Sequence, residues 1–108
     1  MADIQGEIQI DLPMDRIVAF CQRWKIVEFA LFGSVLRDDF GPDSDIDVLV
    51  TFAPDAGWSL FDKVDMLEEL QAVLGRDADL VERPAIEHSR NYMRRKAILR
   101  SARTIYVA

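Results

Sequence analysis

The sequence of 108 residues predicts a single α/β domain, a small β-sheet covered by helices mainly on one face. Two observations lead to this fold class. Short β-branched and apolar runs, typical of strands, alternate with longer segments whose apolar residues recur at helical spacing. Half of the residues are hydrophobic, and no repeat, low-complexity tract or linker divides the chain. We therefore expect one domain over residues 1–108.

The first half of the chain predicts a helix and two strands. The segment MDRIVAFCQRW follows Pro13, which suits the first turn of a helix, and repeats apolar residues at helical spacing. KIVEFALF, residues 25–32, is β-branched and aromatic and ends at Gly33, so it is predicted as a strand. DIDVLVTF, residues 45–52, is predicted as a second strand that ends before Pro54.

The second half predicts a helix, a strand, a helix and a strand. Ser59 is a candidate N-cap, with an acidic residue three positions on, and Gly75 closes the helix that it begins. ADLVE, residues 78–82, is predicted as a short strand. We expect one helix over residues 84–102 and a final short strand, TIYV, at residues 104–107.

The charge is negative overall and unevenly distributed. The chain has 13 basic and 19 acidic residues, a formal net charge of −6. Because nucleic-acid binding depends on Lys and Arg displacing counterions, we expect no stable binding to DNA or RNA. Residues 90–103, RNYMRRKAILRSAR, hold six basic groups and no acid. This segment is either a basic helix that serves a site or partner, or a solvated face.

From the remaining bulk features we expect a cytoplasmic protein that does not bind a membrane. No stretch approaches the roughly 20 continuous apolar residues that span a bilayer. The N-terminal segment MADIQGEIQI has early acids and no basic flank, unlike a signal peptide. The single cysteine, Cys21, cannot form an internal disulfide, which suits a reducing compartment.

A pair of carboxylates at the start of the second strand is the first candidate site. Side chains alternate along a strand, so Asp45 and Asp47 are expected to point the same way. Two such carboxylates repel each other, and one would protonate unless a cation neutralised them. Mg²⁺ is the natural partner for hard oxygen ligands. The alternative is that this aspartate-rich segment, PDSD, only forms and caps a turn.

The turn after the first strand is a candidate phosphate site. Gly33 permits close approach of the backbone to a ligand, and the Ser34 hydroxyl can donate to phosphate oxygens. Arg37, three residues further on, can bind phosphate as a fork. The same short stretch therefore supplies an anion cradle and a cation-binding pair, and a polyphosphate that carries Mg²⁺ requires both.

These motifs resemble the signature of the nucleotidyltransferase superfamily related to DNA polymerase β: Gly33-Ser34, ten residues, then DID at 45–47. The size resembles its minimal nucleotidyltransferase (MNT) branch, which includes the MntA-type antitoxins of HEPN/MNT toxin–antitoxin pairs. The family has a third carboxylate between apolar residues on a later strand. Asp79 matches it better than Asp77 or Glu82. The resemblance covers residues 12–107 and implies the polymerase β-like fold, a small mixed sheet with helices.

The resemblance also implies a reaction. Asp45 and Asp47 would hold one or two Mg²⁺ ions that bridge the nucleotide triphosphate. Asp79 would complete the metal site and could take the proton of the acceptor hydroxyl. The nucleotide-binding residues would be Gly33, Ser34 and Arg37. Attack at the α-phosphate would transfer a nucleoside monophosphate and release pyrophosphate.

Three functions are compatible with the resemblance. The first is transfer of AMP from ATP to a hydroxyl, such as a tyrosine, of a HEPN-type toxin that is thereby silenced. The second is an aminoglycoside-type transfer to a small molecule, although 108 residues leave little room for an acceptor pocket. The third is a non-catalytic antitoxin that neutralises its partner by binding alone.

Several other residues carry weaker signals. Trp58 either covers the loop before a helix or stacks on a base, and Lys63 is a further phosphate candidate. His88 is expected to be an exposed helix residue and Cys21 a core residue. A basic stripe could contact the triphosphate or a partner, or only solvent; its members are Arg90, Arg94, Arg95 and Lys96.

Overall fold

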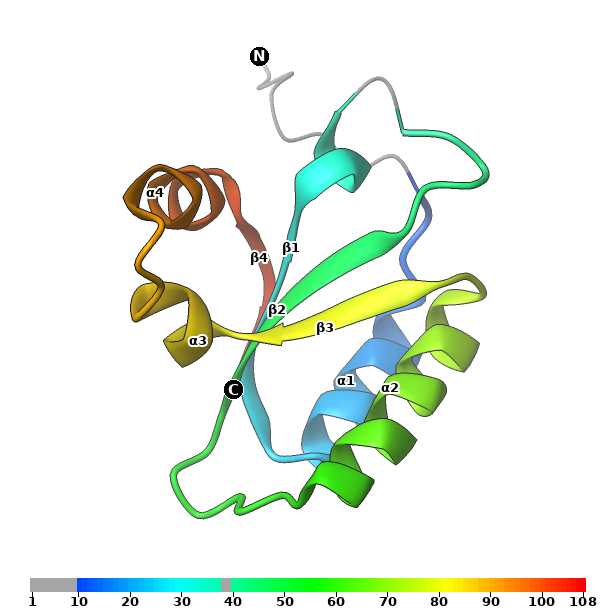
Figure 1. The fold of residues 1–108 in the computed structure, drawn as a ribbon. Helices are drawn as coiled ribbons and strands as arrows, with labels where there is room; N and C mark the ends of the chain where they lie inside the picture. The colour runs from blue at the N-terminus through cyan, green and yellow to red at the C-terminus, as the bar shows by residue number, and fades with distance from the viewer. Residues whose placement is uncertain (1–9, 38–39) are drawn as a thin grey trace.

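The computed structural model describes residues 10–37 and 40–108 (Figure 1). The N-terminal segment considered above for a targeting signal and the two aspartates at 38–39 lie outside the described residues. The elements in chain order are α1 (Met14–Arg23), β1 (Ile26–Phe32), the 3-10 helix η1 (Gly33–Leu36), β2 (Ile46–Phe52), α2 (Leu60–Leu74), β3 (Ala78–Glu82), α3 (Arg83–Glu87), α4 (Tyr92–Ser101) and β4 (Arg103–Val107).

The strands form one mixed sheet in the order β3-β2-β1-β4. β1 is antiparallel to both β2 and β4, whereas β2 and β3 are parallel. The chain can return in parallel from β2 to β3 because α2 provides the crossover connection. The α/β fold class with a small mixed sheet is therefore as expected.

One face of the sheet carries the main apolar core. The helices α1 and α2 pack on this face, with Phe20 of α1, Met66 and Leu70 of α2 and Phe29 of β1 all fully buried. Phe20 and Phe29 meet edge to face with ring centroids 6.4 Å apart. The α2 crossover is well defined at its start, since Ser59 and the residue three positions on form the complete capping box.

The opposite face carries a second, smaller cluster. Ala30, Phe32 and Leu49 project from β1 and β2 and pack with Ile86 of α3 and Ile98 of α4. The expectation that helices cover mainly one face is therefore wrong. Figure 1 shows α3 and α4 on the other side of the sheet from α1 and α2. Apolar residues alternate to both faces of the two central strands, so both faces need a cover.

The prediction of one helix over residues 84–102 is also wrong, because the segment forms α3 and α4 with a break between them. Asn91 begins the second helix as its N-cap, and its side chain accepts a hydrogen bond of 3.0 Å from the Arg94 amide. Ser89 accepts from the Asn91 amide at 3.2 Å. Such local side-chain bonds compete with a continuous helix.

Candidate active site

Two neighbouring strands bring Asp47 and Asp79 side by side. β2 and β3 run parallel, and Asp47 is the register partner of Asp79. Register partners project their side chains from the same face of a sheet. That face is the one covered by α3 and α4, because Leu49 and Val81, two residues further along each strand, pack in its apolar cluster. Asp79, the predicted third carboxylate, therefore lies beside Asp47.

The predicted carboxylates form one electrostatic group. Burial raises the pKa of the Asp47 carboxyl above its ordinary value, and the negative charges of Asp79 and Asp45 raise it further. The positive charges of Arg37 and Arg94 lower the same pKa. Asp47 is half-buried, whereas Asp45 and Asp79 are exposed. This balance favours a bound cation, because an added positive charge offsets the repulsion among the carboxylates.

Gly33 lies directly against this group. It begins η1 with φ +79°, in the left-handed region that favours glycine. A Cβ at this position would collide with the Asp47 carboxylate oxygen Oδ2. The close approach arises because Phe32, the last residue of β1, is the register partner of Asp47. Glycine therefore allows the turn to follow β1 without displacing the carboxylate.

Ser34 and Arg37 flank the same turn. The Ser34 hydroxyl donates to the backbone carbonyl of Asp45 at 3.4 Å, which ties the turn to the residue before β2. The Arg37 amide donates to the Ser34 carbonyl at 2.9 Å, and the exposed Arg37 side chain places its charge within reach of Asp47. All six predicted site residues thus lie at one end of the sheet, where β1 ends and β2 and β3 begin. The Ser34 hydroxyl proton, however, is donated within the protein.

The chemistry of the three carboxylates suits the predicted Mg²⁺, whereas their spacing in the structure does not form a closed metal site. Carboxylate oxygens are the ligands that this ion prefers. Within residues 10–37 and 40–108, no group of three or more Asp, Glu, His or Cys side chains is gathered closely enough to hold a metal ion. Mutual repulsion disfavours the close approach of bare carboxylates. The exposed side chains of Asp45 and Asp79 can turn toward an ion by changing rotamer.

Arg94 is the charged neighbour that sequence reasoning did not single out. It appeared only as one of four basic residues in a stripe. The structure distinguishes it, since it is the residue of α4 whose charge acts on Asp47. A helical-wheel comparison with Ile98, one turn later, could have placed it on the inward side of α4. The packing partner of that side was not evident from the sequence.

The weaker candidates have structural roles in this fold. The Trp58 indole donates to the Trp24 carbonyl at 2.8 Å and meets the Trp24 ring edge to face, so it packs over its loop. Lys63 of α2 forms an ion pair of 2.7 Å with Glu82, so the Glu82 side chain is directed to α2, whereas Asp79 lies on the face of α3 and α4. His88 is exposed, as expected, but it is the C-cap after α3 and not a helix residue. Cys21 is a core residue, and burial raises the pKa of its thiol to about 12.

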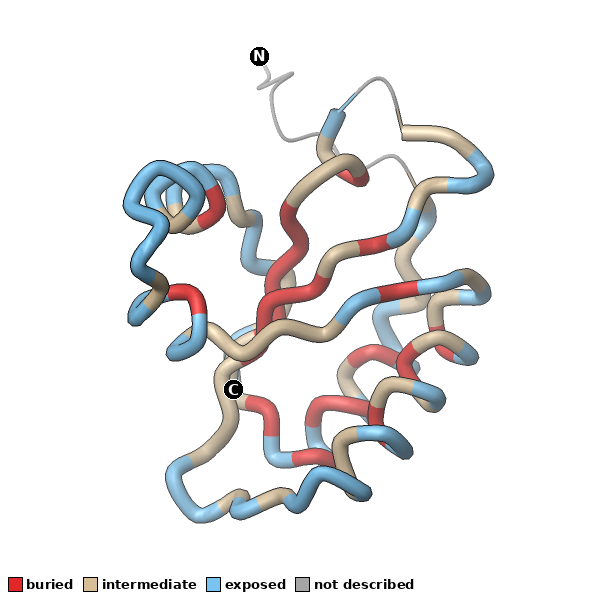
Figure 2. Tube along the Cα trace, viewed as in Figure 1, coloured by how far each residue is buried: buried red, intermediate tan, exposed pale blue. Residues whose placement is uncertain are grey.

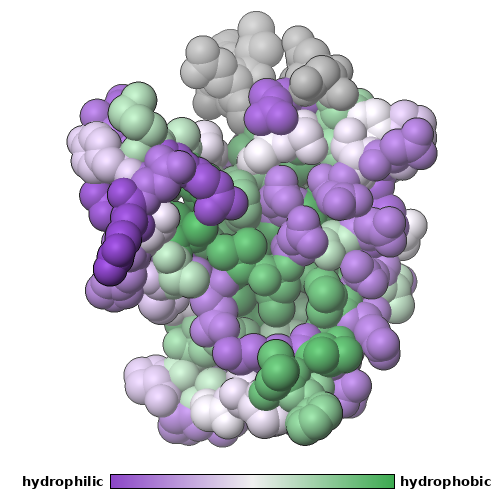
Figure 3. Space-filling model, in the orientation of Figure 1, coloured by the Kyte–Doolittle hydropathy of each residue, from purple (hydrophilic) through white to green (hydrophobic). Residues whose placement is uncertain are grey.

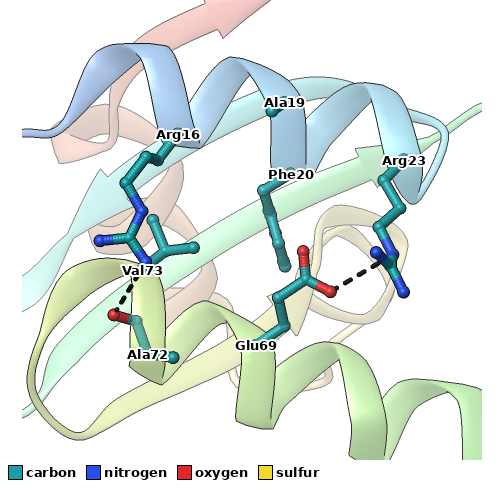
Figure 4. A pocket seen from close by; sticks show the side chains of 7 residues that line it. All are labelled: Arg16, Ala19, Phe20, Arg23, Glu69, Ala72 and Val73. Carbon is teal, nitrogen blue, oxygen red and sulfur yellow. Dashed lines mark hydrogen bonds and ion pairs between the residues drawn. The ribbon is translucent and has the colours of Figure 1, made fainter.

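A cavity of about 550 Å³ lies between α1 and α2, on the face away from the carboxylates (Figure 4). Phe20 and Val73 contribute its apolar lining. Arg23 is paired with Glu69 at 3.4 Å, and Arg16 donates to the Ala72 carbonyl at 3.5 Å. The arginines at this cavity are thus directed to α2, and the cavity adds nothing to the carboxylate site.

Residues 16–104 match the nucleotidyltransferase domain family, and the chain therefore belongs to it. The protein adenylyltransferase MntA of Thermococcus cleftensis is 35% identical over 66 residues, which make up 61% of this chain and 65% of that protein. The chain spans just under two thirds of the length of the first curated relatives that it matches, 66% and 65%.

No helix among the described residues is long and apolar enough to cross a membrane.

Solved structures confirm the fold. One that is provisionally described as a minimal nucleotidyltransferase is 31% identical, with a TM-score of 0.63, and the match covers 82% of this chain and 84% of that chain. A chain from the complex of tri-AMPylated Shewanella oneidensis HEPN toxin with MNT antitoxin has a TM-score of 0.59 at 19% identity, over 87% of this chain and 69% of that one. The chain thus has the minimal, polymerase β-like nucleotidyltransferase fold.

Proposed function

We propose that the protein is a Mg²⁺-dependent nucleotidyltransferase that moves AMP from ATP to a hydroxyl, such as a tyrosine, of a HEPN-type toxin, and that it acts as the antitoxin. The observation that carries this proposal is the pairing of Asp47 with Asp79 beside Asp45 and the Gly33 turn, within a chain of this family. The choice of AMP and of a protein acceptor is supported by the relative named protein adenylyltransferase. The HEPN partner is supported by the complex with AMPylated toxin.

The residues divide the chemistry among them. Asp45, Asp47 and Asp79 would hold the Mg²⁺, which supplies positive charge for the attacking and leaving oxygens when bound. A new bond forms between the acceptor oxygen and the α-phosphorus, and the bond from that phosphorus to the leaving pyrophosphate breaks. Asp79 would take the acceptor proton, and its exposure on the edge strand β3 supports this role because an incoming hydroxyl could approach it.

The turn would bind the triphosphate. Gly33 lets the turn pass against Asp47 without displacing its carboxylate, and the backbone of the turn would approach the triphosphate closely because no side chain intervenes. The Arg37 guanidinium can donate two parallel hydrogen bonds to phosphate oxygens and offset the charge that develops on pyrophosphate. Ser34 would keep the turn tied to Asp45, or redirect its hydroxyl to a phosphate oxygen, since a hydroxyl rotates at little cost.

Transfer of label tests the proposal. ATP labelled at the α-phosphate is incubated with Mg²⁺ and a lysate of the source organism, with wild type, Asp47→Asn and Asp65→Asn in parallel. Asp65→Asn is the matched control, an exposed aspartate on α2. We expect one labelled protein band with wild type and the control. The Asp47→Asn variant should give less than about 1% of that label, because it removes a metal ligand.

Other outcomes would contradict the proposal in different ways. Label that appears only in a small molecule would favour the aminoglycoside-type transfer. A toxin that is still neutralised by Asp47→Asn, without transfer of label, would favour neutralisation by binding alone. A melting temperature of wild type that does not respond to Mg²⁺ with ATP would count against the nucleotide site itself, since a ligand that binds only the native state stabilises it.

A further inference from the structure

The helix α4 lies over the same face of the sheet as the carboxylates. Its Ile98 is buried and packs in the cluster that contains Phe32 and Leu49. Phe32 is the register partner of Asp47 in β1, and Leu49 is the next residue of β2 on the same face as Asp47. This apolar contact holds α4 against the face of the sheet on which Asp47 lies. The stripe of α4 that contains Ile98, called here the inward stripe, is therefore turned toward that face.

Arg94 lies on that inward stripe, one helical turn before Ile98. Because that stripe faces the cluster that adjoins Asp47, Arg94 lies on the side of α4 that is turned toward the start of β2. The Arg94 charge is also close enough to lower the pKa of the Asp47 carboxyl. Figure 3 shows hydrophilic side chains on α4 and, facing them, on the surface over the starts of β2 and β3, with apolar surface below. Arg37 approaches Asp47 from η1, on a different element.

The other cations in the middle of α4 are already engaged. Arg95 donates from Nη1 to the Ser89 carbonyl at 3.1 Å, and its guanidinium lies 5.2 Å from the centre of the Tyr92 ring. Lys96 lies over the same ring at 5.8 Å. The exposed Arg94 side chain makes no hydrogen bond or ion pair with another described residue. Its donors are therefore available to a ligand.

We propose that Arg94 is a substrate-binding residue that holds the outer phosphates of the nucleoside triphosphate from α4, whereas Arg37 would approach them from the end of η1. This inference rests on the proposed function, because it names how the same site binds its substrate. A triphosphate that enters a group of aspartates meets strong repulsion, and a guanidinium fork is the side chain best suited to offset it. The Asn91 cap and the buried Ile98 fix α4 on either side of Arg94, which limits the entropy lost on binding.

Nucleotide affinity tests this role without requiring turnover. Arg94→Gln is compared with Arg100→Gln, a matched change of an exposed arginine on the same helix that is not on the Ile98 stripe. Dissociation constants for ATP and for AMP are measured by calorimetry in the presence of Mg²⁺. We expect Arg94→Gln to raise the dissociation constant for ATP about 10-fold or more, which is typical for loss of a charge-assisted hydrogen bond. AMP should change little, and Arg94→Lys should recover part of the ATP affinity.

Three results would overturn the inference. The inference is wrong if the Arg94→Gln variant binds ATP as tightly as wild type does. A rise in the KM for the acceptor in that variant would then indicate that Arg94 contacts the acceptor. If Arg94→Gln weakened the binding of ATP and of AMP equally, Arg94 would not contact the outer phosphates, because AMP lacks them. If Arg100→Gln weakened ATP binding as much as Arg94→Gln does, the loss would come from the overall charge of the helix and not from a contact of Arg94.

The same data separate this inference from the proposed function. Wild type that binds ATP but transfers no label contradicts the proposed transfer, and the Arg94 comparison still applies. Wild type that binds no ATP contradicts both. Melting temperatures of the variants check that each remains folded, which we expect because both arginines are exposed.

Discussion

The two faces of the sheet differ in how much apolar core their helices bury. Under α1 and α2 lies a thick core in which Phe20, Met66 and Leu70 are fully buried. Under α3 and α4 the cluster is small, and Ile86 and Ile98 are the buried side chains that these helices contribute. Figure 2 shows the contrast, since α4 is exposed along most of its length, whereas the sides of α1 and α2 that face the sheet are buried.

This difference explains where the candidate site lies. Charged side chains are costly to bury, so a face that is fully covered by apolar helices cannot hold a cluster of carboxylates. The partial cover on the second face leaves Asp79 exposed and Asp47 half-buried. Residual burial still affects the site, because it raises the pKa of Asp47. We infer that the first face supplies most of the stability, whereas the second face leaves space for the charged side chains of the candidate site.

The largest stability effect should come from the first face. Leu70→Ala removes a fully buried side chain from the core between α2 and the sheet. We expect it to lower the free energy of unfolding by about 2–5 kcal/mol, from lost burial and the cavity left behind. Urea unfolding measures this loss. Transfer of label per folded molecule should remain near that of wild type, and a comparable loss of transfer would contradict the division between the faces.

Ile98→Ala is the counterpart on the second face. Its stability cost should lie near the lower end of the same range, about 2 kcal/mol, because the cluster around α4 is smaller and can relax. The variant should nevertheless weaken ATP binding, since α4 carries Arg94 over the site. Calorimetry with ATP and Mg²⁺ checks this. If Leu70→Ala weakened ATP binding as much as Ile98→Ala does, the proposed difference between the two faces would be wrong.

Gly33→Ala tests the contact between the turn and the carboxylate. The positive φ and the collision with Asp47 together should cost about 1–3 kcal/mol of stability. Transfer should fall as well, because Asp47 must shift. Gly41→Ala is the control, since a Cβ there would meet no atom within 4 Å. Urea unfolding and transfer of label are measured for both variants. Equal stability and equal transfer in Gly33→Ala and Gly41→Ala would show that glycine is not required at position 33.

The smallest effect should be the pH dependence of stability due to Asp47. Because the pKa of Asp47 is raised on folding, its ionisation opposes folding. That penalty is absent below the pKa of the unfolded state and grows as pH rises through the pKa of the folded state. Asp47→Asn should therefore gain stability relative to wild type between about pH 4 and about pH 7 in metal-free buffer.

Urea unfolding at both pH values measures this change, with Asp65→Asn as the control on α2. A difference between wild type and Asp47→Asn that does not vary with pH would show that repulsion and burial at Asp47 do not affect folding. Addition of Mg²⁺ should reduce the difference, since the ion would bind the wild-type carboxylates.

Much of the fold could be predicted because its signals are local. Ser59 caps α2 and Gly75 ends it with φ +74°, as their chemistry indicated. The strands were found within a residue or so of their bounds, because β-branched runs bounded by glycine and proline are read directly from the chain. The break before Asn91 was missed, since a short side-chain cap inside a basic segment is a weak signal.

The order of residues along the chain alone determined which groups could form the candidate site. The turn at Gly33 and the carboxylates at the start of β2 are close in sequence. The antiparallel pairing of β1 with β2 is therefore enough to bring them together. Only the tertiary structure decided that Asp79 stands in register with Asp47, that a second face is covered, and that Arg94 of α4 reaches the same carboxylates. The physical reason is that strand register and helix placement depend on apolar packing between distant segments, which no local pattern specifies.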